Sequence, residues 1–217
     1  MVWAVLAAAG RGERLGDDRP KAFARLGDLP LVAEPMRRLD ESDWIDGIVV
    51  AAPPDWEEPC IVLAEELGAG KVSAVVTGGE TRAASVRAAL AEVPDDVAVV
   101  LVHDAARPLV SDDVIGRVLA PLSDGYDGAV PVIPVSDTAK RVRDGDVVET
   151  VEREGLVLAQ TPQAFLAGAL RRAAAGEGTD CAALVEAQGG RVRAVPGDPR
   201  LLKVTSPEDL ELVASWL

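Results

Sequence analysis

The chain has 217 residues and is 48% hydrophobic, so it can bury a sizeable core without disulfides or metal ions as staples. Its formal net charge of -14 disfavours DNA, RNA and anionic membrane surfaces as partners, because phosphate-rich surfaces bind basic faces. An anionic small molecule needs only a local positive pocket and is not excluded. Aromatic residues make up 3%, so we expect a core of Val, Leu, Ile and Ala, as in parallel sheets covered by helices.

The cysteines bear on metal sites and disulfides, and the opening segment bears on the cellular location of the protein. Cys60 and Cys181 are isolated, without CxxC spacing, and predict buried thiols rather than a zinc site or a disulfide. The opening MVWAVLAAAG lacks the basic region of a secretory signal and runs directly into a glycine-rich turn. No apolar stretch approaches the length of a membrane span. We therefore expect a cytoplasmic protein.

Apolar runs alternate with helical patterns along most of the chain. Strands are predicted at residues 2–9, 48–52, 72–76, 97–102 and 128–132. Helices are predicted at about residues 31–39, 55–67, 81–92 and 111–122, with Thr81 and Ser111 as N-caps. Short apolar strands separated by helices predict an α/β fold with a mostly parallel, doubly wound sheet.

The pattern changes after Pro134. Residues 138–143 and 147–151 are β-prone runs around Asp144-Gly145, a pair typical of hairpin turns. Charged and apolar residues alternate there, so we expect the hairpin to project from the body. A two-stranded arm is only marginally stable alone, and a second subunit is the simplest surface for it to pack on. Beyond it we predict helices near 164–174 and 180–188, a strand near 192–195 and a last helix from Pro207.

A glycine-rich loop follows the first predicted strand. Residues 6–16 read LAAAGRGERLG, and Pro20-Lys21 comes shortly after. Small residues let the backbone approach a ligand closely, and successive free N–H groups form an anion-binding concavity. Arg14 and Lys21 would add positive charge against a polyphosphate. An ordinary strand–helix turn with surface Arg and Lys is the alternative, and Leu15 stands where a dinucleotide-binding pattern needs its third glycine.

A charged segment, LVHDAARP, follows the fourth predicted strand at residues 101–108. A carboxylate at the carboxyl end of such a strand lies on the ligand side of an open α/β sheet. Asp104 could therefore hold Mg²⁺ or a substrate hydroxyl, and Arg107 could clamp a phosphate. His103 is the only histidine. A lone His beside a strand end is more often packed and hydrogen-bonded than catalytic, so we assign it no acid–base role.

A third segment, GGETRAAS at residues 78–85, lies between the third predicted strand and its helix. Glycines and hydroxyls at a helix N-terminus suit hydrogen bonds to a nucleobase edge or a ribose, and an N-capped turn is equally compatible. All three segments follow the carboxyl ends of strands, which places them on one rim of the sheet. Their basic residues would make a cationic pocket in an otherwise acidic protein.

Seven segments, in order along the chain, carry a family resemblance: AAAGRGERL with PK after it, GGETRAASV, VLVHDAARP, VSDTAKR, TVEREGL, QTPQAF and LLKVTSPEDL. Together they resemble the methylerythritol phosphate cytidylyltransferase family across nearly the whole chain. The resemblance implies a Rossmann-like nucleotidyltransferase core, one domain over residues 1–217, with residues 136–156 as a β-arm that clasps a second subunit in a homodimer. It also implies that the cytidylyl group of CTP is transferred, with Mg²⁺, to 2-C-methyl-D-erythritol 4-phosphate in the non-mevalonate route to isoprenoid precursors.

The resemblance further implies roles for individual residues. The CTP site matches Ala8, Ala9, Gly10, Gly79, Glu80, Ser85 and Ala105, and the catalytic cations around the phosphates match Arg14, Lys21 and Lys203. The pocket for the sugar-alcohol phosphate matches Asp104, Arg107, Thr138, Arg153, Thr161 and Thr179. Thr138 and Arg153 are expected from the partner's arm, and Asp104 is also expected at the metal. The chain departs from the family at Glu80, where Asp is common, and at Cys181, where an acidic residue is common.

Other activities remain open at this stage. The implied nucleophile is already a phosphate anion, so the reaction needs positioning and electrostatic stabilisation rather than a general base. A ribitol 5-phosphate or other polyol-phosphate cytidylyltransferase would share the core, and a sugar-1-phosphate nucleotidyltransferase would share the first loop. A non-catalytic nucleotide-binding regulator is disfavoured, because it has no need of Arg14, Lys21, Asp104 and Lys203 together. The incomplete dinucleotide pattern disfavours a dehydrogenase.

Overall fold

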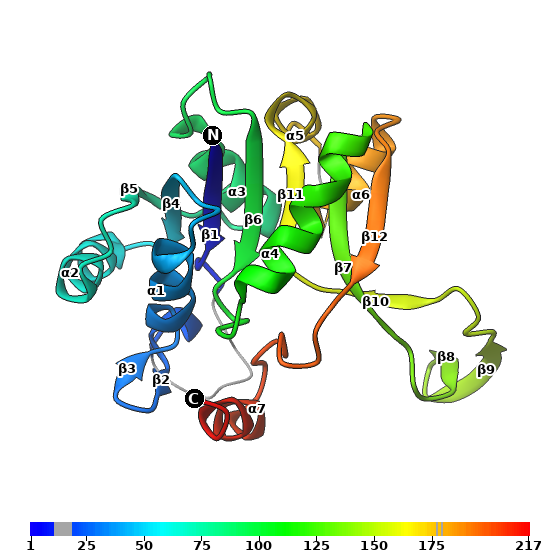
Figure 1. Cartoon of the computed structure of the whole chain (residues 1–217). Helices are drawn as coiled ribbons and strands as arrows, with labels where there is room; N and C mark the ends of the chain where they lie inside the picture. Colours follow the sequence, from blue (N-terminus) through cyan, green and yellow to red (C-terminus); the bar gives the residue numbers. More distant parts are fainter. Residues whose placement is uncertain (11–18, 177, 179) are drawn as a thin grey trace.

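A mostly parallel sheet forms the centre of the molecule (Figure 1). The structure, a computed structural model, describes residues 1–10, 19–176, 178 and 180–217. Four parallel strands lie in the order β5 (Val72–Thr77), β4 (Gly47–Ala52), β1 (Val2–Ala7) and β6 (Val99–Asp104). Antiparallel β11 (Gln163–Leu166) joins β6 to β7 (Gly128–Pro134), which also pairs with antiparallel β10 (Val157–Ala159) and parallel β12 (Val192–Pro196).

Helices cover both faces of this sheet, as predicted. On one face α1 (Ala33–Glu41), α2 (Glu57–Leu67) and α4 (Asp112–Leu119) pack against strand residues such as Leu6 and Val50. On the other face α3 (Arg82–Ala91), α5 (Ala167–Ala173) and α6 (Cys181–Ala187) pack against their strand neighbours Val5 and Val49. Successive residues of a strand point to opposite faces, so fully apolar strands are what two covered faces require. Both cysteines are buried free thiols, as predicted.

One predicted helix begins with a strand. A helix is expected from Ala164, but residues 163–166 form β11 and the helix begins only at Ala167. Phe165 is completely buried between β6 and β7. A short apolar run fits a buried strand as well as a helix, and only the neighbouring strands decide between them. Short elements also go unpredicted, namely two 3₁₀ turns, η2 (Lys21–Phe23) and η3 (Ala120–Asp124), the small hairpin of β2 (Arg25–Leu26) and β3 (Leu29–Pro30), and β10.

The predicted N-caps differ in outcome. The side chain of Thr81 accepts a hydrogen bond from the backbone N–H of Ala84 (3.1 Å), so it caps α3. Ser111 stands at the N-cap position of α4 but makes no capping hydrogen bond with its side chain. The last helix, α7 (Pro207–Ala214), begins with a capping box formed by Ser206 and Asp209.

The predicted hairpin is present and projects from the body (Figure 1). Strands β8 (Ala139–Arg143) and β9 (Asp146–Val151) pair only with each other among the described strands. Asp144 and Gly145 have φ of 51° and 92°, the left-handed conformation that a tight two-residue hairpin turn requires. Within the described ranges, no helix is long and apolar enough to cross a membrane.

Candidate active site

Three loops meet at the carboxyl edge of the parallel strands. Ala8, Gly78 and Ala105 are the first residues after β1, β5 and β6. The N–H groups of Ala8 and Gly78 donate to carbonyls of β4 (2.9 and 2.8 Å), and the N–H of Ala105 donates to a carbonyl of β1 (3.0 Å). The hydrogen bonding of the sheet therefore continues one residue beyond the strands. This holds the three loops side by side, as their shared position after parallel strands predicts.

The loops enclose a pocket of about 470 Å³. Its lining includes ten of the residues that the sequence singles out: Ala8, Ala9, Gly10, Lys21, Gly79, Glu80, Ser85, Asp104, Ala105 and Lys203. Arg14 and Thr179 lie outside the described residues. Among the described lining residues three cations face two carboxylates, in a chain whose net charge is -14. The predicted local excess of positive charge is therefore present.

Glycines give the pocket its shape on the side of β5. A Cβ on Gly78 would lie 2.1 Å from the Cβ of Ala9, and a Cβ on Gly79 would lie 2.4 Å from the Cβ of Ala84. The buried hydroxyl of Ser85 accepts from the N–H of Gly79 (3.1 Å) and donates to a backbone carbonyl of its own loop (3.0 Å). Ser85 thus fixes the Gly78–Gly79 turn from behind, and only glycine lets the two loops approach this closely.

Lys21 reaches the pocket from a short, anchored turn. It begins η2, where the N–H of Phe23 donates to the carbonyl of Pro20 (2.8 Å). Phe23 is buried, and its ring lies 4.4 Å from that of Trp56 at the start of α2. The lysine is therefore attached to a fixed backbone although it lies in a loop.

Lys203 comes from the other end of the chain. Its neighbours Leu201 and Val204 are fully buried, and the N–H of Val204 donates to the carbonyl of Ala106 (2.8 Å). This contact fastens the segment between β12 and α7 to the loop after β6. The side chain of Lys203 is 43% exposed and donates to Oδ2 of Asp104 (2.8 Å).

Asp104 is the electrostatic centre of the pocket. Its Oδ1 accepts from Nε of Arg82 (2.8 Å), and its Oδ2 accepts from Lys203. Burial alone would raise the pKa of the Asp104 carboxyl, but the two adjacent cations outweigh burial and hold that pKa well below its usual range. Arg82 has no individual role among the predictions made from the sequence. A cation in the first turn of a helix is electrostatically unfavourable, and this is the signal in the sequence that it has a partner.

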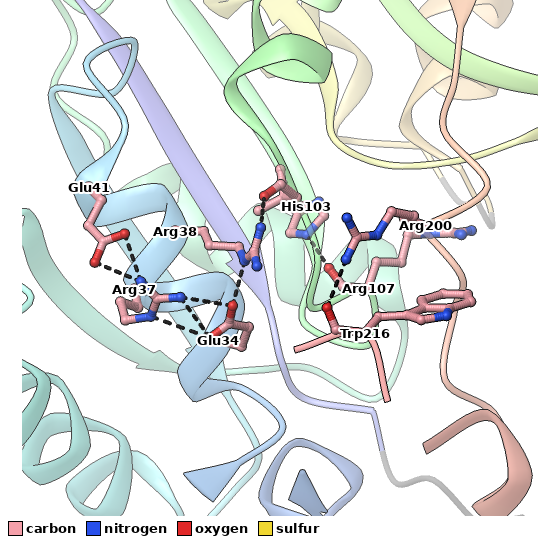
Figure 2. Close-up of polar contacts among 9 residues, drawn as sticks. Glu34, Arg37, Arg38, Glu41, His103, Arg107, Arg200 and Trp216 are labelled. Atoms are coloured by element: carbon pink, nitrogen blue, oxygen red, sulfur yellow. Dashed lines mark hydrogen bonds and ion pairs between the residues drawn. The ribbon is translucent and has the colours of Figure 1, made fainter. Parts of the chain in front are cut away.

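His103 is packed inside the protein, as predicted, and does not line the pocket. Figure 2 shows its ring directed at the backbone carbonyl of Arg107, to which Nε2 lies at 2.9 Å. A carbonyl only accepts, so Nε2 carries the proton and Nδ1 accepts from the hydroxyl of Thr161 (3.1 Å). The same hydroxyl accepts from the N–H of Asp104 (3.0 Å). This chain of three hydrogen bonds fixes the end of β6.

The remaining predicted residues lie away from the lining of the pocket. Arg107 donates to the backbone carbonyls of Leu201 (2.6 Å) and Ala159 (3.5 Å). Thr161 is buried behind Asp104, in the hydrogen-bond chain just described. Thr138 and Arg153 are exposed at the base of the arm, where the guanidinium of Arg153 donates to a backbone carbonyl.

The described residues contain no group of three His, Cys, Asp or Glu side chains that could hold a metal ion. Asp104 is, however, a single ionised carboxylate beside two cations that suit phosphates. Mg²⁺ typically binds one or two carboxylates together with substrate phosphates and water, rather than a cage of protein ligands. Each carboxylate oxygen can accept more than one hydrogen bond or ligand. The donor set therefore fits Mg²⁺ carried in with a nucleotide.

The fold and this pocket define a nucleotidyltransferase: a parallel sheet whose glycine loops and lysines gather at one rim around the buried carboxylate of Asp104. Comparisons with known proteins narrow the class. The family model of IspD, 2-C-methyl-D-erythritol 4-phosphate cytidylyltransferase, matches residues 2–217. The chain belongs to this family, and it is a cytidylyltransferase.

Relatives and solved structures match along the whole chain. The cytidylyltransferase of that name from Frankia casuarinae is 46% identical over 220 residues, covering 100% of this chain and 81% of the relative. The one from Rhodococcus opacus is 46% identical over 215 residues, covering 97% and 92%. The crystal structure of the Thermus thermophilus enzyme superposes with a TM-score of 0.80 at 35% identity, covering 98% of this chain and 96% of that one.

Proposed function

We propose that the pocket transfers the cytidylyl group of CTP to 2-C-methyl-D-erythritol 4-phosphate, giving 4-diphosphocytidyl-2-C-methyl-D-erythritol and pyrophosphate. This is the reaction that the name of the family states. The observation that carries it is the gathering of Lys21, Asp104 and Lys203 with the glycine loops around one pocket. These residues come from distant parts of the chain, and together they suit a triphosphate.

The glycine loops would hold the nucleotide. In the proposal Ala8, Ala9 and Gly10 approach the triphosphate with their backbone, where small side chains leave N–H groups accessible. Gly79, Glu80, Ser85 and Ala105, from the segments after β5 and β6, would surround the base and the ribose. The tight Gly78–Gly79 turn supports this division, because a larger residue would close the space between the loops.

The cations would supply most of the catalysis. The phosphate of the second substrate attacks the α-phosphorus of CTP and pyrophosphate leaves, so two anions must approach each other. Lys21 and Lys203, with Arg14, would neutralise charge that grows on the phosphoryl oxygens. The nucleophile needs no deprotonation. That agrees with His103, which is buried, neutral and turned away from the pocket.

Asp104 would be the protein ligand of Mg²⁺, with the remaining positions filled by phosphate oxygens and water. Bound Mg²⁺ supplies charge neutralisation on the triphosphate. Asp104 itself would also orient the second substrate, together with Arg107, Thr161 and Thr179. Thr161 would act through the backbone of Asp104, to whose N–H it is bonded.

The arm would complete the pocket of a second subunit. We propose one domain over residues 1–217, with residues 136–156 as the arm of a homodimer in which Thr138 and Arg153 reach the other subunit's substrate. The exposed valines of the arm support this: Val142, Val147 and Val148 are 57%, 62% and 51% exposed. Apolar side chains gathered on a projecting hairpin are typical of an interface. Two free thiols agree with a cytoplasmic location, which the proposal includes.

The direct test is pyrophosphate release from CTP with Mg²⁺, comparing methylerythritol phosphate with ribitol 5-phosphate side by side. We expect release with methylerythritol phosphate and little with ribitol 5-phosphate. Pyrophosphate release with ribitol 5-phosphate alone would show instead that the protein is a polyol-phosphate cytidylyltransferase with the same core. If neither acceptor reacts, the proposal is wrong, and a panel of nucleotides and sugar phosphates would replace it.

A further inference from the structure

Arg82 is the third cation of the pocket. It is the first residue of α3, directly after the N-cap Thr81. Its side chain is 21% exposed and lines the pocket with Lys21 and Lys203. Burial lowers the pKa of a guanidinium, but the adjacent carboxylate of Asp104 outweighs burial and raises the pKa of Arg82 above its ordinary value. Arg82 is therefore charged at neutral pH.

The guanidinium is held from two sides. Its Nε donates to Oδ1 of Asp104 (2.8 Å), and one terminal nitrogen donates to Sγ of Cys181 (3.2 Å). Cys181 is 1% exposed and begins α6, so the rear contact is rigid. An arginine can make these two contacts at once because its donors form a planar fork, whereas a lysine presents a single nitrogen.

The two cations bind different oxygens of the same carboxylate. Arg82 occupies Oδ1 of Asp104, and Lys203 occupies Oδ2 (2.8 Å). A carboxylate fixed through one oxygen has a defined plane, so its second oxygen has a defined position. Lys203 is the more exposed partner, with a long side chain that is 43% exposed. Cys181 therefore holds Arg82, Arg82 orients Asp104, and Asp104 orients Lys203.

We propose that Arg82 is a positioning residue for nucleotidyl transfer: it orients the Asp104 carboxylate, and through it the Lys203 ammonium that faces the phosphates. This proposal rests on the proposed function. Arg82 acts through Asp104 and need not touch either substrate. Cys181, whose thiol pKa is raised by burial, holds the guanidinium from behind as a neutral group. Asp104 is therefore the carboxylate that balances the positive charge of Arg82.

The test compares Arg82→Gln and Arg82→Lys with Arg87→Gln. Arg87 is a matched control, because it lies on the same helix and, within the described part of the chain, donates to the backbone carbonyl of Ala174 (3.3 Å) and to no pocket residue. Turnover is divided by the CTP-binding sites counted by calorimetry, so that misfolded protein does not contribute. We expect Arg82→Gln to lower kcat about 10- to 100-fold, as loss of an orienting partner typically does. Arg82→Lys should recover only part of this, and Arg87→Gln should turn over like the wild type.

A double-mutant cycle with Asp104→Asn separates positioning from a merely structural role. If Arg82 acts through the Asp104 carboxylate, Arg82→Gln should cost much less in the Asp104→Asn background, measured by single turnover at high enzyme concentration. Equal losses in both backgrounds would overturn the proposal, as would wild-type turnover of Arg82→Gln or Arg82→Lys. Should Arg82→Gln not fold, the cycle is run with Arg82→Lys. An inactive wild type would instead refute the proposed function, so the two failures are distinguishable.

Discussion

Replacing His103 with glutamine removes the only histidine of the chain and tests how the end of β6 is held. His103 is completely buried, and burial, with smaller opposing contributions from nearby groups, lowers its pKa from 6.5 to about 4. The charged groups that face it are Asp104, which favours the protonated ring, and Arg82 and Arg107, which oppose it. In the unfolded chain the pKa of the same ring returns to its ordinary value.

The sign and size of the effect follow from these two pKa values. Below about pH 6.5 the unfolded state binds a proton that the folded state refuses, so the free energy of unfolding falls with falling pH until the folded pKa is reached. The pKa of His103 is 6.5 in the unfolded chain and about 4 in the folded protein. The free energy of unfolding should therefore fall by about 2 kcal/mol between about pH 7.5 and pH 5 because of this residue. Most carboxylates remain ionised over this range, so the histidine dominates the difference.

The assay is urea unfolding at a series of pH values, for the wild type and His103→Gln, with a chelator present so that metal binding does not contribute. Glutamine can still donate to the carbonyl of Arg107 but does not titrate. We expect the wild type to lose stability steeply toward pH 5 and the variant to lose about 2 kcal/mol less over the same interval. Parallel pH profiles for the two proteins would show that His103 is not held neutral, and would refute the hydrogen-bond chain.

Three further predictions concern the pocket and the arm. Lys21→Ala and Lys203→Ala should each lower kcat about 100-fold, corresponding to about 3 kcal/mol at the transition state, and wild-type turnover of Lys21→Ala would contradict its assignment. Gly78→Ala places a Cβ 2.1 Å from that of Ala9 and should destabilise the fold by about 1–3 kcal/mol in thermal unfolding. The control is Gly10→Ala, whose added Cβ meets no atom of the described residues within 4 Å and which should unfold like the wild type. Mixing inactive Arg153→Ala and Lys203→Ala subunits should restore about a quarter of wild-type activity if each arm serves the other subunit's pocket, and no recovery would count against the arm.

The sequence predicts the framework of the site well. Apolar strands separated by helices require a parallel sheet with two covered faces, and the carboxyl ends of parallel strands share one rim. Ala8, Gly79 and Asp104 therefore had to meet, although they are far apart in the chain. The hairpin is equally predictable, because Asp144-Gly145 favours the left-handed turn that closes it.

Other features of the site are decided by long-range packing. Arg82 and Asp104 are 22 residues apart, and Lys203 and Asp104 are 99 apart, so no local pattern joins them. From the sequence Lys203 is identifiable only through the family resemblance, and the position of Arg82 at a helix start indicates a partner without identifying it. Arg107 donates to two backbone carbonyls that no local pattern predicts, and its place at a phosphate stays a prediction.

Residue patterns along the chain were enough to predict the sheet, its covered faces and the rim where the loops meet, because periodicity and turn chemistry act over a few neighbouring positions. The family was indicated separately, by the resemblance of seven segments. Folding was needed to show that residues 163–166 form a strand, and that one carboxylate binds two cations through different oxygens. The physical reason is that the direction of a long side chain, and the pairing of a short apolar run, are set by neighbours that folding brings from elsewhere in the chain.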